Sequence, residues 1–273
     1  MLSFDGTFLF YFSKKVCEEM KVFVMNKKRA VSYLALIFCA VCILTIGTLQ
    51  SADVWNDGGD KLLPIYSVEK GNEKVCALTF DAAWDDADTD VLINILKKYN
   101  VPATFFMVGS WVEKYPESVK KFHDAGHEIM NHSDTHPHID QLSDTKIKEE
   151  ISKCNDKIEN LTGTRPILFR GPYGEYNNAV IKEAQNQSMF VLQWDVDSLD
   201  WKNLSAADIT ARVTNRVKPG SVMLFHNGAK NTPEALPQVI EKLQADGFTF
   251  VKASDLIYKD NYTIDHSGKQ ILN

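Results

Sequence analysis

Two histidines four residues apart are the clearest sign of chemistry in this chain. They are His132 and His136, in the run His-Ser-Asp-Thr-His. Neutral imidazole is the commonest protein ligand for a catalytic first-row metal, and two at this spacing can reach one ion from a single helical turn or a tight loop. A carboxylate, Asp81, and a third imidazole, His226, each end an apolar run elsewhere. The sequence therefore predicts a hydrolytic metal site.

Each of these residues also has an ordinary structural interpretation. An aspartate at the end of a strand, such as Asp81, often only caps a helix or forms a turn. A histidine within an apolar strand, such as His226, is usually a buried and hydrogen-bonded side chain. The tryptophans Trp194 and Trp201 could line a sugar pocket, although a buried indole more often belongs to the core. The spacing of the histidine pair is what favours metal ligands.

The elements that must position these residues follow from hydrophobic periodicity. Short apolar runs predict strands, and apolar residues at steps of three to five predict amphipathic helices between them. The predicted strands are 75–80, 103–108, 128–131, 167–170, 190–194, 221–226 and 249–251. The predicted helices are 91–99, 112–125, 142–161, 179–187, 206–217 and 233–246.

Strands that alternate with helices predict an α/β fold with a parallel sheet and right-handed crossovers. Seven strands predict a distorted (β/α) barrel that falls short of eight units. In such barrels the chemistry lies at the carboxyl ends of the strands. The candidates lie at or just after the ends of five predicted strands: Asp81, His132, Arg170, Trp194 and His226.

Composition and charge narrow the class of partner. The 273 residues, 44% of them hydrophobic, suit one catalytic domain with an appendage. The whole chain has a net charge of −6. Residues 1–49 carry +3, so the rest of the chain carries −9. An acidic domain of this kind argues against a nucleic-acid partner, because nucleic acids bind to positively charged surfaces. Cys76 and Cys154, outside the apolar span described next, are expected to be buried free thiols.

The N-terminal region predicts a membrane segment. Residues 31–49 carry no charge, and Lys27, Lys28 and Arg29 precede them. A span of this length crosses the hydrocarbon layer, with the flanking cations on the cytoplasmic side. It could be a cleaved signal peptide, but the cleavage signature at 50–52 is poor, which favours an uncleaved transmembrane helix. Either way the catalytic domain lies outside the cytoplasm.

The expected organisation has five parts. Residues 1–30 are a cytoplasmic segment or the product of an upstream start-site error, since Met25 resembles a natural start. The transmembrane helix (31–49) and a polar linker (50–71) follow. The catalytic domain occupies 72–260, and 261–273 form a C-terminal tail.

Five motifs occur in a fixed order along the domain. They are Thr-Phe-Asp (79–81), His-Ser-x-x-His (132–136), Arg-x-Pro-Tyr-Gly (170–174), Asp-x-x-Asp-Trp (197–201) and Leu-x-His (224–226). This order resembles the polysaccharide deacetylases of the NodB-homology type, carbohydrate esterase family four. The resemblance covers roughly residues 72–258. It implies a distorted (β/α) barrel with the active site in a groove at its mouth.

The resemblance also implies roles for individual residues. It makes His132 and His136 ligands of a divalent metal, with zinc expected and cobalt or another divalent ion as alternatives. Asp81 becomes the general base, and His226 the general acid. The remaining implied residues assist these four. Arg170 orients Asp81, and Asp200 polarises His226. The backbone N–H of Tyr173, in the rigid turn that Pro172 forms, holds the oxyanion, and Trp194 and Leu224 line the acetyl pocket.

The first motif departs from the family pattern. The usual Thr-Phe-Asp-Asp-Gly has a second aspartate that binds the metal, and Ala82 stands at that position here. Asp86, with Asp85 as an alternative, is the expected third ligand, unless a water takes its place. The variant resembles a sporulation-associated branch of the family in bacteria that form endospores.

The expected function is hydrolysis of N-acetyl groups on cell-wall amino sugars, with release of acetate. The glycan would be peptidoglycan or an N-acetylglucosamine polymer, and we expect a monomer. Two alternatives stay open. One is a hydrolase of the same fold with another substrate, an O-acetyl glycan ester or a small cyclic amide. The other is a non-catalytic wall-binding protein whose metal site is degenerate at Ala82.

Overall fold

The computed structural model describes residues 3–4, 7–10, 23–26 and 61–273, and the chain divides into two units, Met1–Asp60 and Lys61–Asn273. In the first unit, β1 (Ser3–Phe4), β2 (Thr7–Phe10) and β3 (Phe23–Asn26) form an antiparallel sheet. The predicted membrane span 31–49 lies outside the described residues. Among those that are described, no helix is long and apolar enough to cross a membrane.

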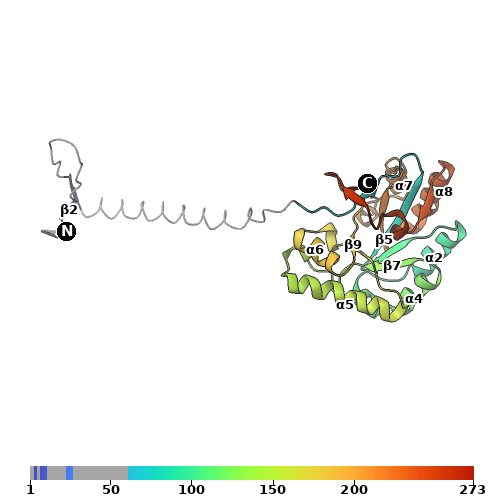
Figure 1. Ribbon diagram of the computed structural model, residues 1–273, viewed down its shortest axis with the longest axis horizontal. Coiled ribbons are helices and arrows are strands. Elements are labelled where there is room, and N and C mark those ends of the chain that lie inside the picture. The colour runs from blue at the N-terminus through green and yellow to red at the C-terminus, as the bar shows by residue number, and fades with distance from the viewer. Residues whose placement is uncertain (1–2, 5–6, 11–22, 27–60) are drawn as a thin grey trace. The chain divides into compact units, whose positions relative to one another are not determined.

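The second unit is built on a parallel sheet in which β5 is the central strand (Figure 1). The strand order is β10-β11-β5-β6-β7-β8-β9, and β12 pairs with the first residues of β5. Every pairing in this sheet is parallel, as the alternation of elements predicted. The strands are β5 (Val75–Ala82), β6 (Thr104–Met107), β7 (Glu128–Asn131), β8 (Leu168–Phe169), β9 (Phe190–Val191), β10 (Val196–Asp197), β11 (Val222–His226) and β12 (Thr249–Val251).

The seven predicted strands are all present, and the distorted α/β barrel is confirmed. The additional strand, β10, is two residues long and has no alternating pattern of its own. The strand order ends at β9 on one side and at β10 on the other. Between them, Ile65 bridges Leu192 beside β9, and Ser67 bridges Ser221 at the start of β11.

The helices surround the strands (Figure 1). The predicted helix 112–125 is two helices, because Pro116 begins the second and has no N–H for a continuous ladder. The helices are α2 (Thr89–Lys98), α3 (Gly109–Lys114), α4 (Pro116–Asp124), α5 (Asp144–Thr162), α6 (Asn178–Asn186), α7 (Ala206–Thr214), α8 (Thr232–Ala245) and α9 (Ala253–Leu256). Three short 3-10 turns are η1 (Ile139–Gln141), η2 (Pro172–Gly174) and η3 (Asp200–Lys202).

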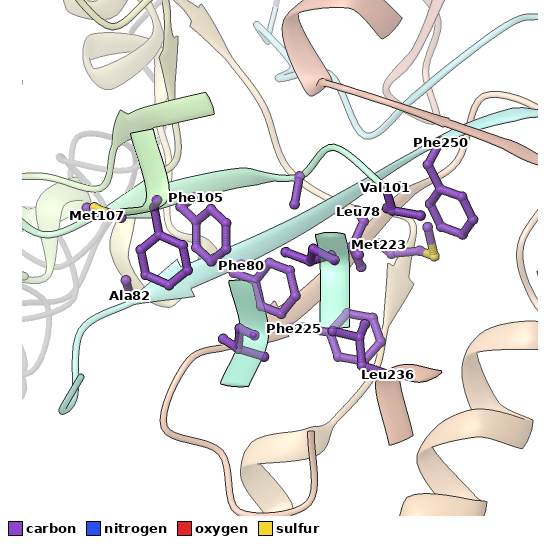
Figure 2. Close-up of a cluster of buried hydrophobic side chains, with 14 of the residues drawn as sticks. Leu78, Phe80, Ala82, Val101, Phe105, Met107, Met223, Phe225, Leu236 and Phe250 are labelled. Carbon is purple, nitrogen blue, oxygen red and sulfur yellow. The ribbon is translucent and has the colours of Figure 1, made fainter. Parts of the chain in front are cut away.

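The central strand separates two kinds of side chain. All eight residues of β5 are buried. Leu78, Phe80 and Ala82 belong to the large apolar cluster that includes Phe105 and Phe225 (Figure 2), and the rings of Phe80 and Phe105 stack at 4.8 Å. Because successive side chains of a strand point to opposite faces, Thr79 and Asp81 face the other way, toward the barrel interior.

The compact unit extends beyond the limits expected for the domain. Ile65 and Val68, which we expected in the linker, are buried in the core. The expected tail forms β13 (Tyr262–Ile264) and β14 (Lys269–Leu272), and β14 pairs with β4 (Ser67–Val68). These segments are too short to show a period in sequence. Cys76 and Cys154 are buried free thiols, as expected.

Candidate active site

A cavity of about 430 Å³ lies where the carboxyl ends of β5, β7 and β11 meet. The structure brings seven of the predicted site residues to its wall, although they come from segments far apart in sequence. The lining residues are Asp81, Ala83, Trp84, His132, His136, Tyr173, Gly174, Trp194, Asp197, Trp201, Leu224 and His226.

Asp81 is a buried carboxylate held by a buried guanidinium. The Arg170 Nη1 atom donates to Asp81 Oδ1 at 2.7 Å and to Thr79 Oγ1 at 3.0 Å. The other guanidinium nitrogens donate to two backbone carbonyls, which fixes the arginine in place. Burial opposes ionisation of Asp81, but the charge and hydrogen bond of Arg170, together with the nearby imidazoles of His132 and His226, outweigh it and hold the pKa of Asp81 below its ordinary value. Asp81 is therefore an ionised base at neutral pH.

His132 and His136 are neutral imidazoles that face each other. The Nδ1 atom of His132 lies 2.8 Å from the Arg170 carbonyl oxygen, which can only accept, so the proton is on Nδ1. Its Nε2 lone pair then faces Asp81 Oδ2, 3.5 Å away. The two ring centroids are 5.0 Å apart. Burial lowers the pKa of His132, and it lowers that of His136 to about 4. A neutral imidazole has one unprotonated nitrogen, so the two rings together offer two nitrogen ligands suited to a divalent cation.

The structure does not bring Asp86 to these rings, contrary to the expectation that it supplies the third ligand. Asp86 Oδ2 accepts from Ser118 Oγ at 2.7 Å, and the residue does not line the cavity. The side chain of Asp85 accepts from the Ala87 N–H in its own loop. In the described part of the chain, no three His, Cys, Asp or Glu side chains are arranged to hold a metal. Within residues 61–273, the two imidazoles thus have no third protein ligand beside them.

His226 is an imidazole arranged to carry a proton. Its Nδ1 atom lies 2.8 Å from Asp200 Oδ1, and its backbone N–H donates to Asp200 Oδ2 at 2.8 Å. Asp200 is buried and also accepts from the Thr232 hydroxyl at 2.6 Å. Burial favours the neutral ring, but the hydrogen bond and charge of Asp200 outweigh it and raise the pKa of His226. His226 can therefore serve as an acid on the wall of the cavity.

The turn at η2 forms another wall. Tyr173 has the left-handed φ of 59°, and its side chain is 62% exposed. Its ring lies between those of His136 and His138, with centroids 4.6 and 4.7 Å away. The buried Pro172 begins this turn and fixes its backbone. Beyond it, Trp194 and the buried Leu224 supply apolar surface.

Two more tryptophans lie at the cavity: Trp201, which the sequence allowed as a sugar-pocket residue, and Trp84, which was not predicted as a site residue. Trp84 and Trp201 each line it and are each 48% exposed. The Trp84 indole stacks on the His226 imidazole, with centroids 5.4 Å apart and planes at 22°. The available signal was their position, because both follow the end of a strand and belong to no apolar period. An indole placed there has no core to join.

A family profile described as polysaccharide deacetylase matches residues 68–191. The peptidoglycan-N-acetylmuramic acid deacetylase of Bacillus subtilis is 37% identical over 194 residues, which cover 71% of this chain and 41% of that protein. A peptidoglycan-N-acetylglucosamine deacetylase of Bacillus cereus is 36% identical, with coverage of 66% of this chain and 67% of that protein. The chain thus spans less than half of the first relative and about two thirds of the second.

Solved structures give the same family. A peptidoglycan N-acetylglucosamine deacetylase superposes with a TM-score of 0.68 at 34% identity, covering 71% of this chain and 92% of that one. A protein of Bacillus anthracis described as a pseudoenzyme of carbohydrate esterase family four superposes with a TM-score of 0.69 at 34% identity, covering 72% and 69%. With a similar barrel and more than 30% identity to relatives that it largely covers, this chain belongs to the polysaccharide deacetylase family.

Proposed function

We propose that this protein is a metal-dependent hydrolase that removes N-acetyl groups from peptidoglycan amino sugars and releases acetate. The observation that carries the proposal is the convergence of four side chains on one cavity. They are an ionised carboxylate (Asp81), two neutral imidazoles (His132 and His136) and an imidazole that holds a proton (His226). Relatives that are named as peptidoglycan deacetylases support the choice of substrate.

His132 and His136 are the residues that would hold the metal, with zinc as the expected ion and cobalt or another divalent ion as alternatives. When bound, the ion would polarise the acetyl carbonyl as a Lewis acid. The Nδ1–H of His132 donates to the Arg170 carbonyl, which leaves the Nε2 lone pair available, and this nitrogen would hold the metal. With no third protein ligand among the described residues, water would complete the coordination.

Asp81 would act as general base. An amide is a weak electrophile, so the attacking water must lose its proton as it attacks. Arg170 keeps Asp81 ionised and fixes its orientation by the 2.7 Å hydrogen bond. A positioned base of this kind contributes on the order of 10²–10⁴ in rate.

His226 would act as general acid. The departing amine is a poor leaving group as an anion, and a proton from His226 would let it leave neutral. Asp200 holds the imidazole and favours its protonated form. The backbone N–H of Tyr173 would stabilise the oxyanion, which is worth roughly 10²–10³ in rate. Leu224 and Trp194 would enclose the acetyl methyl group.

The test is acetate release from peptidoglycan fragments and N-acetylglucosamine oligomers. We expect His132→Ala, His136→Ala and Asp81→Asn each to abolish it. His123→Ala is the matched control, since this half-buried histidine lies on α4 and does not line the cavity. Unchanged release in the first three variants would contradict the proposal.

A second candidate is a glycan-binding protein without turnover. Ala82 and the pair of imidazoles without a third protein ligand among the described residues favour it. The similar Bacillus anthracis structure is that of a protein described as a pseudoenzyme. Metal analysis of the purified protein separates the two candidates. Stoichiometric zinc supports the hydrolase, whereas glycan binding without metal supports the alternative.

We further propose that the domain acts outside the cytoplasm as an anchored monomer, during sporulation. The uncharged residues 31–49, preceded by three basic residues, motivate the anchor. Peptidoglycan lies on the outer side of the membrane, where such an anchor would place the domain. Fractionation of cells, with and without residues 1–49, tests the anchor, and recovery of the full chain in the soluble fraction would contradict it.

A further inference from the structure

We propose that Trp84 is a positioning residue that holds the His226 imidazole in the orientation needed to protonate the leaving amine. This inference rests on the proposed function, in which His226 is the acid. Trp84 follows the first motif and carries no role in the assignments above. Three features support this role: the contact of its ring with His226, the hydrogen bonds of its loop, and its partial exposure.

The ring contact supplies a constraint that the hydrogen bond of His226 lacks. The bond from Nδ1 to Asp200 fixes one edge of the imidazole, but the ring can still tilt about the line between the two atoms. The Trp84 indole lies almost parallel to the imidazole, at 22° and 5.4 Å between centroids. A flat surface against one face removes the tilt. Together the two contacts fix the direction of the remaining nitrogen, Nε2.

The loop that carries Trp84 is tied to the segment that follows His226. The carbonyl oxygen of Asp85 accepts from the side-chain amide of Asn227 and, at 3.3 Å, from the indole N–H of Trp111. The backbone N–H of Gly228 donates to Asp88 Oδ2 at 2.7 Å. The hydrogen bonds therefore join residues next to Trp84 with residues next to His226, and they hold the two rings in register.

The partial exposure of Trp84 argues against a purely structural role. At 48% exposed, the indole leaves a large part of its surface at the cavity, so it contributes less to the core than a buried tryptophan. Gly228, next to this loop, has the left-handed φ of +73°, which favours glycine, and a Cβ there would make only an ordinary contact with the Cβ of Trp84, at 3.6 Å.

The dependence on the leaving group separates positioning of an acid from other roles. Hydrolysis of an N-acetyl sugar requires a proton on the departing nitrogen, whereas 4-nitrophenolate leaves 4-nitrophenyl acetate as a stable anion without one. We expect Trp84→Ala to lower kcat on N-acetylglucosamine oligomers about 10- to 100-fold, with KM little changed. Hydrolysis of 4-nitrophenyl acetate should stay within about twofold of the wild type, because it needs no acid.

Two variants frame this result. Trp84→Phe keeps a flat ring against His226 and should recover most of the lost kcat. Trp201→Ala removes an equally exposed indole from the same cavity, and any loss should appear in KM for the oligomers, with kcat close to that of the wild type. An equal loss on both substrates in Trp84→Ala, or a rise in KM alone, would overturn the proposal.

A second measurement is independent of turnover. The indole face should shift the His226 ring proton resonances by its ring current, so Trp84→Ala should move them in an NMR spectrum of the folded protein. Resonances that stay in place would overturn the stack and the proposal with it. A difference in these resonances between the wild type and Trp84→Ala, with no acetate release from amides by the wild type, would instead refute the proposed function.

Discussion

Replacing Asp200 by asparagine tests the acid side of the site most directly. Asp200 accepts from the His226 Nδ1–H, from the His226 and Trp201 backbone N–H groups and from the Thr232 hydroxyl. An asparagine is nearly the same size, but it has one acceptor oxygen and one NH₂ group in place of two acceptor oxygens. Whichever way it turns, a backbone N–H or the imidazole N–H loses its acceptor. The change therefore removes both a charge and a bond without leaving a cavity.

The expected effect follows from the pKa of His226, which Asp200 raises. A raised pKa keeps the acid protonated to higher pH, and activity is lost as the pH rises through that pKa. In Asp200→Asn the pKa falls, so the alkaline limb of kcat moves to lower pH. A displacement of the limb by one pH unit corresponds to a loss of about 1.4 kcal/mol in the interaction with the protonated ring. A disabled general acid costs on the order of 10²–10⁴ in rate.

The assay is acetate release from N-acetylglucosamine oligomers between pH 5 and pH 10, with 4-nitrophenyl acetate as the substrate that needs no acid. Thr232→Val is the matched control, since it removes one bond to Asp200 but keeps the carboxylate and both bonds to His226. Its alkaline limb should move less. An Asp200→Asn profile with the wild-type alkaline limb would refute the assignment of His226 as an acid supported by Asp200.

Three further outcomes are expected. Arg170→Met leaves the buried Asp81 carboxylate without its partner, and the free energy of unfolding in urea should fall by about 3–5 kcal/mol. Burial lowers the pKa of His127 to about 4. As the pH drops from 6.5 through 4, this histidine binds a proton in the unfolded chain before it does so in the folded one, and the free energy of unfolding falls by about 3 kcal/mol. His127→Asn should flatten this dependence in thermal melts. Dialysis against a chelator should abolish acetate release, and added zinc or cobalt should restore it; activity that survives chelation would contradict the metal assignment.

The fold was predictable where a period persisted over several residues. The apolar run that forms β5 and the stripe of Ile147, Ile151, Cys154 and Ile158 on α5 each allow one interpretation. The two-residue β10 and the pairing of β14 with β4 were not predictable, because so few residues show no period and pairing partners lie far apart in sequence. Pro116 marked a break within a continuous helical pattern, and the structure divides the helix there.

The site was predictable to the extent that topology decides it. Parallel strands end at the same edge of a sheet, so Asp81 and His226, although far apart in the chain, are register partners on β5 and β11. Loop residues lack this guide. Asp86 is an acidic residue close to Asp81 in sequence, yet its loop turns it toward Ser118. The same loop turns Trp84 onto His226, and no property of the sequence gives the direction of either side chain.

The alternation along β5 gives a physical reason for the pair of imidazoles. Asp81 faces the barrel interior, while Ala82 is fully buried among the apolar side chains on the opposite face of the strand. A carboxylate in that apolar cluster would be costly without a partner. In this geometry the strand end must turn before a second aspartate could reach His132. Instead, Ala82 keeps the regular parallel pairing of β5 with β6, in register with Met107. Strands β5 and β11 therefore place the base and the acid, and the loop after β7 places the two imidazoles. The third ligand position depends on the loop after β5, which places Trp84 against His226.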